Sequence, residues 1–370
     1  MAFAFRTGAT VTILVGALLT PSGEPPQVQV REDQWHLRFL RAADAQRLSQ
    51  GDGITVAIPD TGIDLHPDLA DNVLPGIDLD GASDGRQDIN GHGTSMAGLI
   101  AAHGKSDRTG ALGIAPRAKL LPIRSKLVAG KGDTDELAAS VEWAVTQHAD
   151  VISISATAGA STRLQRAIKS ALDADIVVVA AAGNHPENAS VGYPASEPGV
   201  IAVGGIDRTG AHASASVSGP EIDVAAPAVD IYSTSYGGKY SKGTGTSSAT
   251  AIVAGAAALI RSKYPNLPAA EVAHRLTATA VDKGPPGRDD QYGYGVIDLV
   301  AALTADVPPL GFESTGVTAP APTAAAPDAA GDDSTARGLA TLGALLAAGG
   351  AYLVWRRRRR ADDPPPRISR

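Results

Sequence analysis

Short apolar runs alternate, along the middle of the chain, with segments in which apolar residues recur every three or four positions. The runs are five or six residues long, as expected of buried strands, and lie at 54–58, 119–124, 151–155, 176–181 and 200–204. Segment 135–148 has helical spacing, with Leu137, Val141, Ala144 and Val145 on one face. The alternation predicts a three-layer α/β fold, in which a mainly parallel sheet has helices on both faces.

Two more helices are predicted at 92–103 and 246–264. The second is rich in alanine, which suits a helix that is buried on most sides. In open parallel sheets, ligands bind outside the carboxyl ends of the strands. We therefore expect the functional site near Asp60, Ser155 and Asn184, which stand at three such ends.

The two ends of the chain have apolar patterns of another kind. Arg6 precedes an apolar run over 9–19 and a small polar stretch, which together predict a secretory signal peptide, with an uncleaved anchor or a buried helix as the alternative. Segment 338–355 has 18 residues without a charge, long enough to span a hydrocarbon core of about 30 Å. Its apolar residues would occupy every face of a helix, which favours a transmembrane helix over an amphipathic surface helix.

These patterns predict six regions: a signal peptide at 1–22, an N-terminal extension at 23–50, a main domain at 51–305, a Pro/Ala-rich tether at 306–337, a transmembrane helix at 338–355 and a basic tail at 356–370. Five consecutive arginines open the tail and favour a cytoplasmic C-terminus. The sequence thus predicts a single-pass protein of the cell membrane whose main domain lies outside the cytoplasm.

Charge and cysteine content exclude several classes of function. The chain has 370 residues and a net charge of −7; the last 15 residues contribute +5, so the remainder carries −12. Such an acidic domain lacks the basic face that phosphate contact requires, so we expect no nucleic-acid partner. Because there is no cysteine, disulfides, thiol catalysis and thiolate metal sites are excluded.

Three glycine-flanked segments carry the candidate chemistry. They are Ile58-Pro59-Asp60-Thr61-Gly62, Asn90-Gly91-His92-Gly93-Thr94 and Gly245-Thr246-Ser247-Ser248-Ala249. A serine hydroxyl needs a base to become nucleophilic, and the base needs a carboxylate to fix its tautomer. Taken singly, Asp60 could be a turn residue, His92 structural and Ser247 a helix cap. Together they predict a catalytic triad of Asp60, His92 and Ser247.

The order Asp, His, Ser is that of subtilisin, and other serine hydrolases use other orders. With its surrounding residues, the chain resembles the subtilase family of serine proteases over about 51–303. The resemblance implies a subtilisin-like fold and an endopeptidase that hydrolyses peptide or protein substrates through an acyl-enzyme. An esterase would share this chemistry but would not need strands that pair with a peptide.

The resemblance also implies roles outside the triad. The Asn of Ala181-Ala182-Gly183-Asn184 would donate to the oxyanion together with the Ser247 N–H, which opens a helix. The segment around Ser153, Ser155, Ala156 and Thr157 would pair with the substrate and wall its primary pocket, with a second pairing strand near 126–132. Ser155-Ala156-Thr157 replaces the usual Ser-Leu-Gly-like sequence.

Two departures from the family are visible. Ala251 replaces the proline that commonly stands four residues after the nucleophile; we expect activity to survive, because proline in a first helical turn mostly tunes how the helix starts. A long N-terminal chaperone domain is also missing, which implies folding without a cleavable prodomain or with the short extension wrapped over the domain.

The whole layout is similar to that of the mycosins, the membrane-anchored subtilases of actinobacterial type VII secretion systems. The resemblance implies the secretion machinery as a partner. It also permits a second function, in which the chain is mainly a structural subunit of a secretion complex and catalysis is secondary. Mycobacterial mycosins carry cysteines that this chain lacks, so no disulfide is implied.

No cofactor or metal is needed for the predicted chemistry. Asp78, Asp80, Asp84 and Asp88 are a weak calcium candidate that establishes no site. Asp64 and Asp68 could compete with Asp60 for the role in the triad. They follow the strand end in a His-Pro-Asp turn, so a surface position is expected for them.

Overall fold

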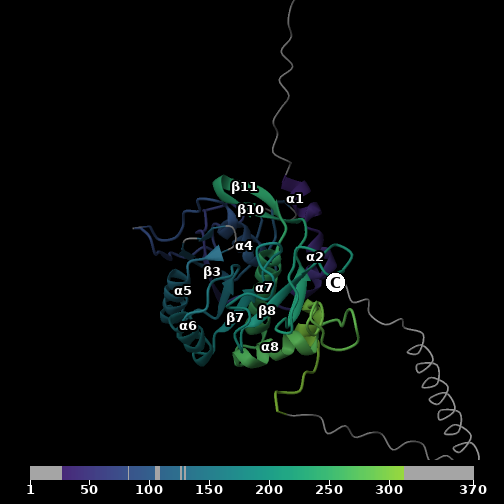
Figure 1. Cartoon of the computed structure of the whole chain (residues 1–370). Helices are drawn as coiled ribbons and strands as arrows, with labels where there is room; N and C mark the ends of the chain where they lie inside the picture. Colours follow the sequence, from purple (N-terminus) through teal and green to yellow (C-terminus); the bar gives the residue numbers. More distant parts are fainter. Residues whose placement is uncertain (1–26, 82, 105–108, 126, 129–130, 312–370) are drawn as a thin grey trace, which may run out of the picture. The chain divides into compact units, whose positions relative to one another are not determined.

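The structure is a computed structural model that describes residues 27–81, 83–104, 109–125, 127–128 and 131–311 (Figure 1). The predicted signal peptide, transmembrane helix and basic tail lie outside the described residues, as does the tether from residue 312 on. Within the described ranges, no helix is both long enough and apolar enough to cross a membrane.

The predicted parallel sheet is confirmed and has seven strands, in the order β2-β3-β1-β6-β7-β8-β9. Every pairing in it is parallel. The strands are β1 (Thr55–Asp60), β2 (Ile77–Asp78), β3 (Lys119–Arg124), β6 (Val151–Ile154), β7 (Val177–Ala181), β8 (Ile201–Ile206) and β9 (Val224–Pro227). Five of them match predicted runs; β2 and β9, at the two edges of the sheet, were not predicted.

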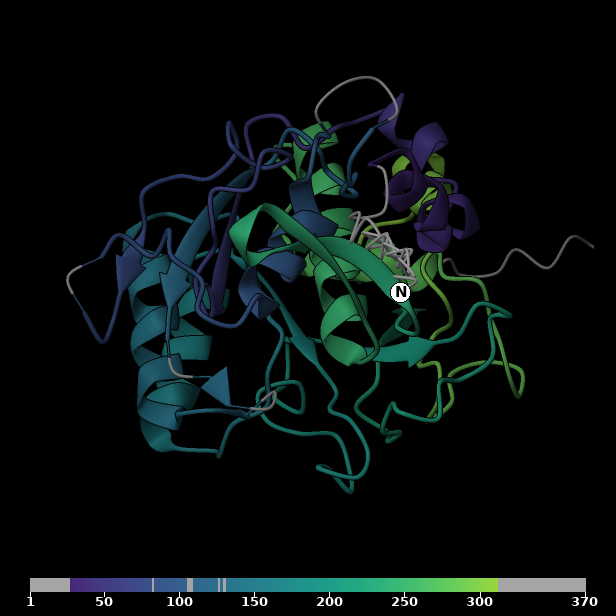
Figure 2. The same cartoon turned by 90° about the horizontal axis from the view of Figure 1, so that it is seen from above.

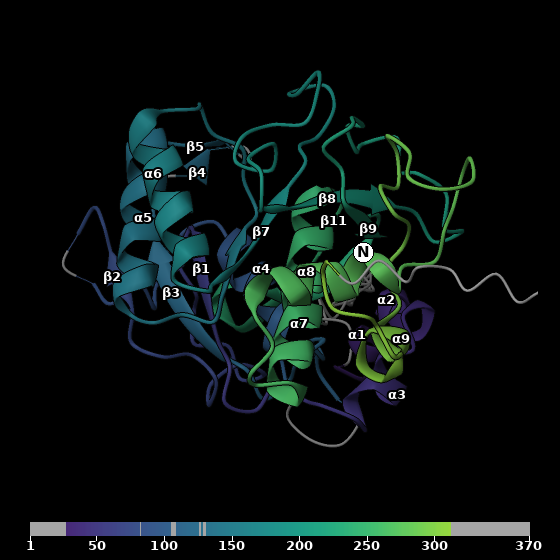
Figure 3. The ribbon, with the colours of Figure 1, turned by 90° about the horizontal axis from the view of Figure 1, so that it is seen from below.

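Helices cover both faces of this sheet, as predicted (Figures 1 and 3). One face carries α5 (Thr134–Thr146) and α6 (Thr162–Asp173), and the other carries α4 (His92–Ala101) and α7 (Thr246–Lys263). Successive strand residues therefore face different cores: Val56 packs with α4 and α7, and Ala57 packs with α5 and α6. Burial on both faces explains why the strands are apolar runs without polar alternation.

Several shorter elements complete the domain. Two hairpins stand outside the sheet, β4 (Leu127–Val128) with β5 (Lys131–Gly132) and β10 (Ile231–Ser235) with β11 (Lys239–Gly243), the latter joined by the 3-10 turn Tyr236–Gly238. Helices α8 (Ala269–Ala278) and α9 (Leu299–Thr304) follow α7. Figure 2 shows the β10–β11 hairpin passing in front of α7.

The N-terminal extension folds into three short helices: α1 (Gln27–Asp33), α2 (Trp35–Phe39) and α3 (Ala42–Gln46). Trp35 is buried in the same core cluster as α4 and α7, and its indole N–H donates to the Val229 carbonyl at 3.0 Å. The Gln34 side chain, also buried, donates to the Leu112 carbonyl at 3.0 Å and accepts from its N–H at 2.8 Å. The described part of the extension is thus integral to the fold, wrapped over the domain.

Candidate active site

Asp60 and His92 form the most direct contact of the site. Asp60 is the last residue of β1 and is almost completely buried. The Nδ1 atom of His92, the first residue of α4, lies 2.8 Å from Asp60 Oδ1 and 2.9 Å from Oδ2. A carboxylate accepts only, so Nδ1 carries the proton and Nε2 is left as the acceptor. The neutral imidazole is therefore held in the tautomer that can receive a proton.

The glycine after His92 lets α4 approach β1 this closely. A Cβ atom built on Gly93 would lie 2.1 Å from the carbonyl oxygen of Gly62, so no larger residue fits without backbone movement. The Gly93 N–H donates to the Thr61 hydroxyl at 3.0 Å. Glycine next to the histidine is therefore a packing requirement of the pair.

Asp88 fixes the loop in front of α4, a role that the sequence did not suggest. Its Oδ1 accepts hydrogen bonds from the Thr61 hydroxyl and from the N–H groups of Asn90 and Gly91, at 2.8–3.0 Å. Its Oδ2 accepts from the Thr94 N–H and hydroxyl, at 2.9 and 2.7 Å. One buried carboxylate thus ties the end of β1 to the start of α4.

The electrostatic surroundings of His92 favour its protonated form. Burial lowers the pKa of the imidazole, whereas the charge and hydrogen bond of Asp60 and the charge of Asp88 raise it. The raising effects prevail, and the pKa of His92 lies above its ordinary value of 6.5. A raised pKa makes the imidazole a stronger base toward a serine hydroxyl.

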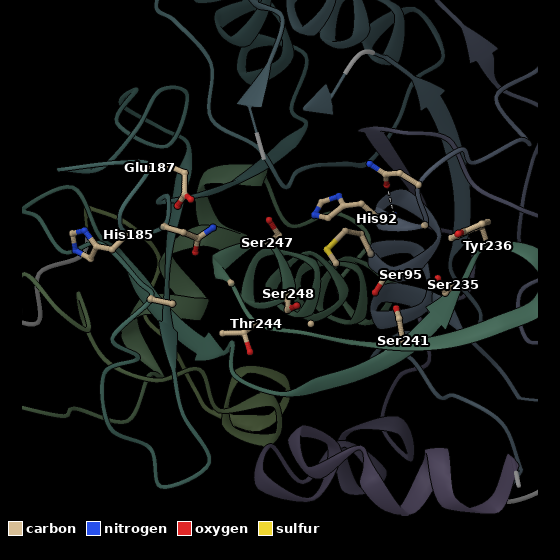
Figure 4. Close-up of a pocket in the computed structure, with 17 residues that line it drawn as sticks. His92, Ser95, His185, Glu187, Ser235, Tyr236, Ser241, Thr244, Ser247 and Ser248 are labelled. Atoms are coloured by element: carbon tan, nitrogen blue, oxygen red, sulfur yellow. Dashed lines mark hydrogen bonds between the residues drawn. The ribbon is translucent and has the colours of Figure 1, made fainter. Parts of the chain in front are cut away.

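Ser247 lies in the first turn of α7 and opens into the same cleft as His92. Its hydroxyl donates to the Ser155 carbonyl at 2.9 Å, while the Ser155 hydroxyl donates to the Ser247 carbonyl at 3.2 Å. Among the hydrogen bonds of the described residues, none joins Ser247 to His92. In Figure 4 both side chains reach into the cleft, the imidazole directed toward Ser247. The structure thus places the three predicted triad residues around one cleft. The Asp60–His92 hydrogen bond is formed, and the His92–Ser247 hydrogen bond is not.

Asn184 follows β7 and lines the cleft beside Ser247. Its Oδ1 accepts from the Thr246 N–H at 2.8 Å and from the Thr246 hydroxyl at 3.2 Å. With the carboxamide oxygen anchored in this way, Nδ2 is left to donate toward the cleft. The N-terminus of α7 adds backbone N–H groups and the positive end of its dipole. Developing negative charge on a substrate oxygen would be stabilised here.

The cleft has a volume of about 600 Å³. His92, Asn184 and Ser247 line it together with residues from the β10–β11 hairpin and the loop after β7, among them Tyr236, His185 and Glu187 (Figure 4). No described residue of the extension lines it. A cleft of this volume is large enough to hold a ligand of several residues or a small molecule.

A side pocket opens from this cleft at Ser247 and Asn184. Three residues of the predicted substrate segment, Ser155, Ala156 and Thr157, line it. Ser153 was also predicted to contact substrate, and this is wrong: it lies inside β6 with a fully buried side chain and lines neither cavity. The reason is that β6 continues through Ile154, so Ser153 still faces the core of the sheet.

The second predicted substrate strand, near 126–132, falls on the β4–β5 hairpin, although Lys126, Ala129 and Gly130 lie outside the described residues. Its Gly132 N–H donates to the Thr157 carbonyl at 2.9 Å. The hairpin therefore already pairs with one end of the predicted substrate segment.

Asp64 and Asp68, the two alternatives to Asp60 as the carboxylate of the triad, both bond other groups of the protein. Asp64 Oδ1 accepts from the Asp88 N–H at 2.9 Å, and Oδ2 accepts from the Gly237 N–H at 2.7 Å. Asp68 was expected at the surface but is completely buried, where it accepts from the Ala111 N–H at 2.7 Å and the Tyr240 hydroxyl at 2.8 Å. The surface prediction failed because the β10–β11 hairpin, which is far away in the sequence, covers the turn.

The carboxylates of the weak calcium candidate also have protein partners. Asp78 accepts from Arg124 and from the Ser83 hydroxyl, each at 2.9 Å, and Asp84 pairs with Arg86. Asp88 bonds the loop before α4, as above. Within the part of the chain that the structure describes, no three His, Cys, Asp or Glu side chains gather as a metal ion would require.

Comparison with known proteins identifies the family of the chain. The model of the subtilase family matches residues 51–295. Subtilisin DY from Bacillus licheniformis is 42% identical over 258 residues, covering 68% of this chain and 92% of that protein. A thermostable alkaline protease from Halalkalibacterium halodurans is 39% identical over 266 residues, covering 71% of each chain.

Solved structures are similar as well. The crystal structure of MycP1 from Mycobacterium smegmatis is 32% identical, with a TM-score of 0.65, and the match covers 74% of this chain and 85% of that one. The structure of the MycP3 protease from the type VII (ESX-3) secretion system is 33% identical, with a TM-score of 0.65, covering 77% and 90%.

Proposed function

Because the chain belongs to the subtilase family and is a serine-type endopeptidase, we propose that Asp60, His92 and Ser247 are its catalytic triad. The observation that carries the proposal is the 2.8 Å contact between buried Asp60 and His92 Nδ1. It leaves Nε2 as an acceptor on a ring that lines the same cleft as Ser247, in the first turn of α7. Asp64 and Asp68 bond other groups, which supports Asp60 as the carboxylate.

The proposed mechanism begins with a rotation of the Ser247 side chain from the Ser155 carbonyl toward His92. Ser247 Oγ then attacks the peptide carbonyl carbon while its proton passes to His92 Nε2. Asp60 holds the Nδ1–H and stabilises the imidazolium. The carbonyl oxygen becomes an oxyanion that accepts hydrogen bonds from Asn184 Nδ2 and the Ser247 N–H.

The reaction is then completed in two stages. In the first, the C–N bond breaks as His92 gives its proton to the leaving amine; the amine departs, and the acyl group stays on Ser247 as an ester. Water, deprotonated by His92, attacks the ester, and Ser247 recovers the proton as the carboxylate product leaves. The cycle consumes one water molecule for each peptide bond and involves no change of oxidation state.

Labelling with a fluorophosphonate probe tests the proposal directly. The wild-type chain should be labelled at neutral pH, and Ser247→Ala should not. Ser248→Ala is the matched control, because Ser248 is the neighbouring serine that also lines the cleft; it should be labelled like the wild type. Labelling of Ser247→Ala, or none of the wild type, would contradict the assignment.

We further propose that the chain is a membrane-anchored component of a type VII secretion system. The sequence pattern of 338–370 and the likeness to MycP1 and MycP3 support this. Because the chain has no cysteine, a single introduced cysteine is its only thiol. On intact cells, an impermeant maleimide should label Gln165→Cys, on an exposed position of α6, and should label Ala361→Cys only after permeabilisation. The reverse pattern would contradict the topology.

A structural role in the secretion complex is the second candidate. It is favoured by one similar protein, MycP1, which is described as an essential component of the type VII (ESX-1) secretion system. Two variants separate the roles. If Ser247→Ala stops substrate processing, catalysis is used; if secretion is lost only on deletion of 338–355, the scaffold function dominates.

A further inference from the structure

The side pocket at Ser247 is narrow, and two side chains account for this. The pocket opens where the residue before the scissile bond would place its side chain, because Ser247 and Asn184 stand at its mouth. Its free volume is about 20 Å³, which is room for about one water molecule. A leucine or phenylalanine side chain does not fit such a space.

Thr157 is one of the residues that line the pocket. Its side chain is buried and packs against Gly192, where a Cβ atom would lie only 2.6 Å from the Thr157 methyl carbon. Since threonine is branched at Cβ, its rotamers are few. Thr157 therefore cannot swing toward Gly192 to make room for a larger ligand.

Asn188 lines the pocket beside Thr157. Its Nδ2 donates to Thr157 Oγ1 at 3.4 Å, and its Oδ1 accepts from the Asn184 N–H at 3.1 Å. The Asn188 N–H in turn donates to the Asn184 carbonyl at 2.8 Å. The carboxamide is thus held at both ends, and the hydrogen-bonded Thr157–Asn188 pair, which we call the bar, lines the pocket.

We propose that this bar makes the protein a protease that cleaves after small residues, with alanine, serine and glycine accepted before the scissile bond and large side chains refused. The inference rests on the proposed function, since it takes Ser247 as the nucleophile. Thr157 and Asn188 act as specificity-determining residues and take no part in the bond-breaking steps.

Glu187 offers the competing possibility. Its exposed carboxylate lines both the cleft and the side pocket and would attract a basic side chain. The aliphatic part of a lysine or arginine side chain, however, would need more space than the pocket lined by Thr157 and Asn188 provides. The geometry therefore favours size, rather than charge, as the property that is selected.

The test measures kcat/KM of the full chain on succinyl-Ala-Ala-Pro-Xaa-p-nitroanilides with Xaa as Ala, Leu, Phe or Lys, each rate divided by the fraction of enzyme that a fluorophosphonate labels. In the wild type, kcat/KM for the alanine substrate should exceed that for the phenylalanine substrate by about tenfold or more. Thr157→Gly should raise kcat/KM for the phenylalanine substrate by about tenfold or more. It should leave kcat/KM for the alanine substrate within about threefold of the wild type. Thr157→Val is the matched control, because it keeps the bulk and loses only the hydroxyl; it should retain the preference for alanine.

The outcomes separate this inference from the proposed function. An enzyme that is labelled at Ser247 but prefers phenylalanine or lysine overturns the small-residue specificity and leaves the triad intact. An enzyme that is not labelled overturns the proposed triad itself. If Thr157→Gly does not fold, Thr157→Ser removes one methyl group and should raise the leucine value; an unchanged profile would contradict the role of Thr157.

Discussion

The hydroxyl of Ser247 donates a 2.9 Å hydrogen bond to the backbone carbonyl of Ser155. This contact engages the hydroxyl of the proposed nucleophile, so in the proposed mechanism the side chain rotates before the His92 imidazole takes its proton. The Ser155 carbonyl is also an acceptor that a substrate N–H could use. The Ser247 hydroxyl and a substrate N–H would therefore compete for the same acceptor, the Ser155 carbonyl oxygen.

Replacing Asp60 with asparagine tests which carboxylate orients the base. Asp60→Asn should lower kcat/KM by about 10⁴-fold, because a carboxamide cannot stabilise the imidazolium or fix the tautomer. The measurement is peptide hydrolysis, with circular dichroism to confirm the fold.

Asp64→Asn is the matched control for that variant. Asp64 is the nearest competing carboxylate in the sequence, and it accepts bonds from backbone groups only. Its variant should stay within about tenfold of the wild type, given the usual cost of one hydrogen bond. Equal losses in both variants would remove the special role of Asp60.

The raised pKa of His92 predicts the pH at which kcat/KM falls on the acidic side of its pH profile. His92 acts as a base only when neutral, and its pKa lies above 6.5. Activity should therefore rise with pH and reach half of its maximum at a pH above 6.5. The measurement is kcat/KM between pH 5 and 9, which reports on the free enzyme. A midpoint below 6.5 would mean that Asp60 and Asp88 do not outweigh burial.

Asn184 should act on the transition state rather than on substrate binding. Asn184→Ala should lower kcat by about 10²–10³-fold with little change in KM, because the oxyanion forms only as the bond breaks. His185→Ala, at the exposed neighbour that lines the same cleft, should change neither constant by more than about threefold. A rise in KM without a fall in kcat would assign Asn184 to ground-state binding instead.

His36 should make the docked extension sensitive to acid. Its ring is fully buried in α2, and neither nitrogen has a hydrogen-bond partner among the described residues. Burial, aided by the charge of Arg38, lowers its pKa from 6.5 to about 3. Between these values the unfolded chain binds a proton that the folded chain does not, so stability falls as pH drops below 6.5.

The measurement for His36 is the thermal unfolding midpoint between pH 4 and 8. His36→Leu should lose part of the decline below pH 6.5 that the wild type shows. Identical pH profiles of the two proteins would show that His36 does not limit the stability of the extension in acid.

The sequence was informative where a proposed functional residue stands at or near the boundary of an element. Asp60 ends a strand, His92 begins a helix, Ser247 lies in the first turn of another helix, and Asn184 follows a strand. Apolar runs and glycines were therefore enough to predict where these residues stand in the fold. The helices of the extension escaped prediction because they are five to seven residues long, too short for a periodic pattern.

Contacts between distant segments could not be predicted in this way. The Thr157–Asn188 bar joins two loops 31 residues apart, and the burial of Asp68 depends on Tyr240, which is 172 residues away. Ser153 was misplaced for a related reason, since the sequence does not show at which residue β6 leaves the core. Such contacts depend on how the layers pack, which hydrophobic periodicity does not encode.

The most direct test of the central claim is the turnover of Ser247→Ala on a peptide substrate, beside the wild type and Ser248→Ala. With Ser247 as the nucleophile, its loss should reduce kcat by about 10⁶-fold, while Ser248→Ala should remain active. A Ser247→Ala protein that still hydrolyses the peptide within about tenfold of the wild-type rate would contradict the account.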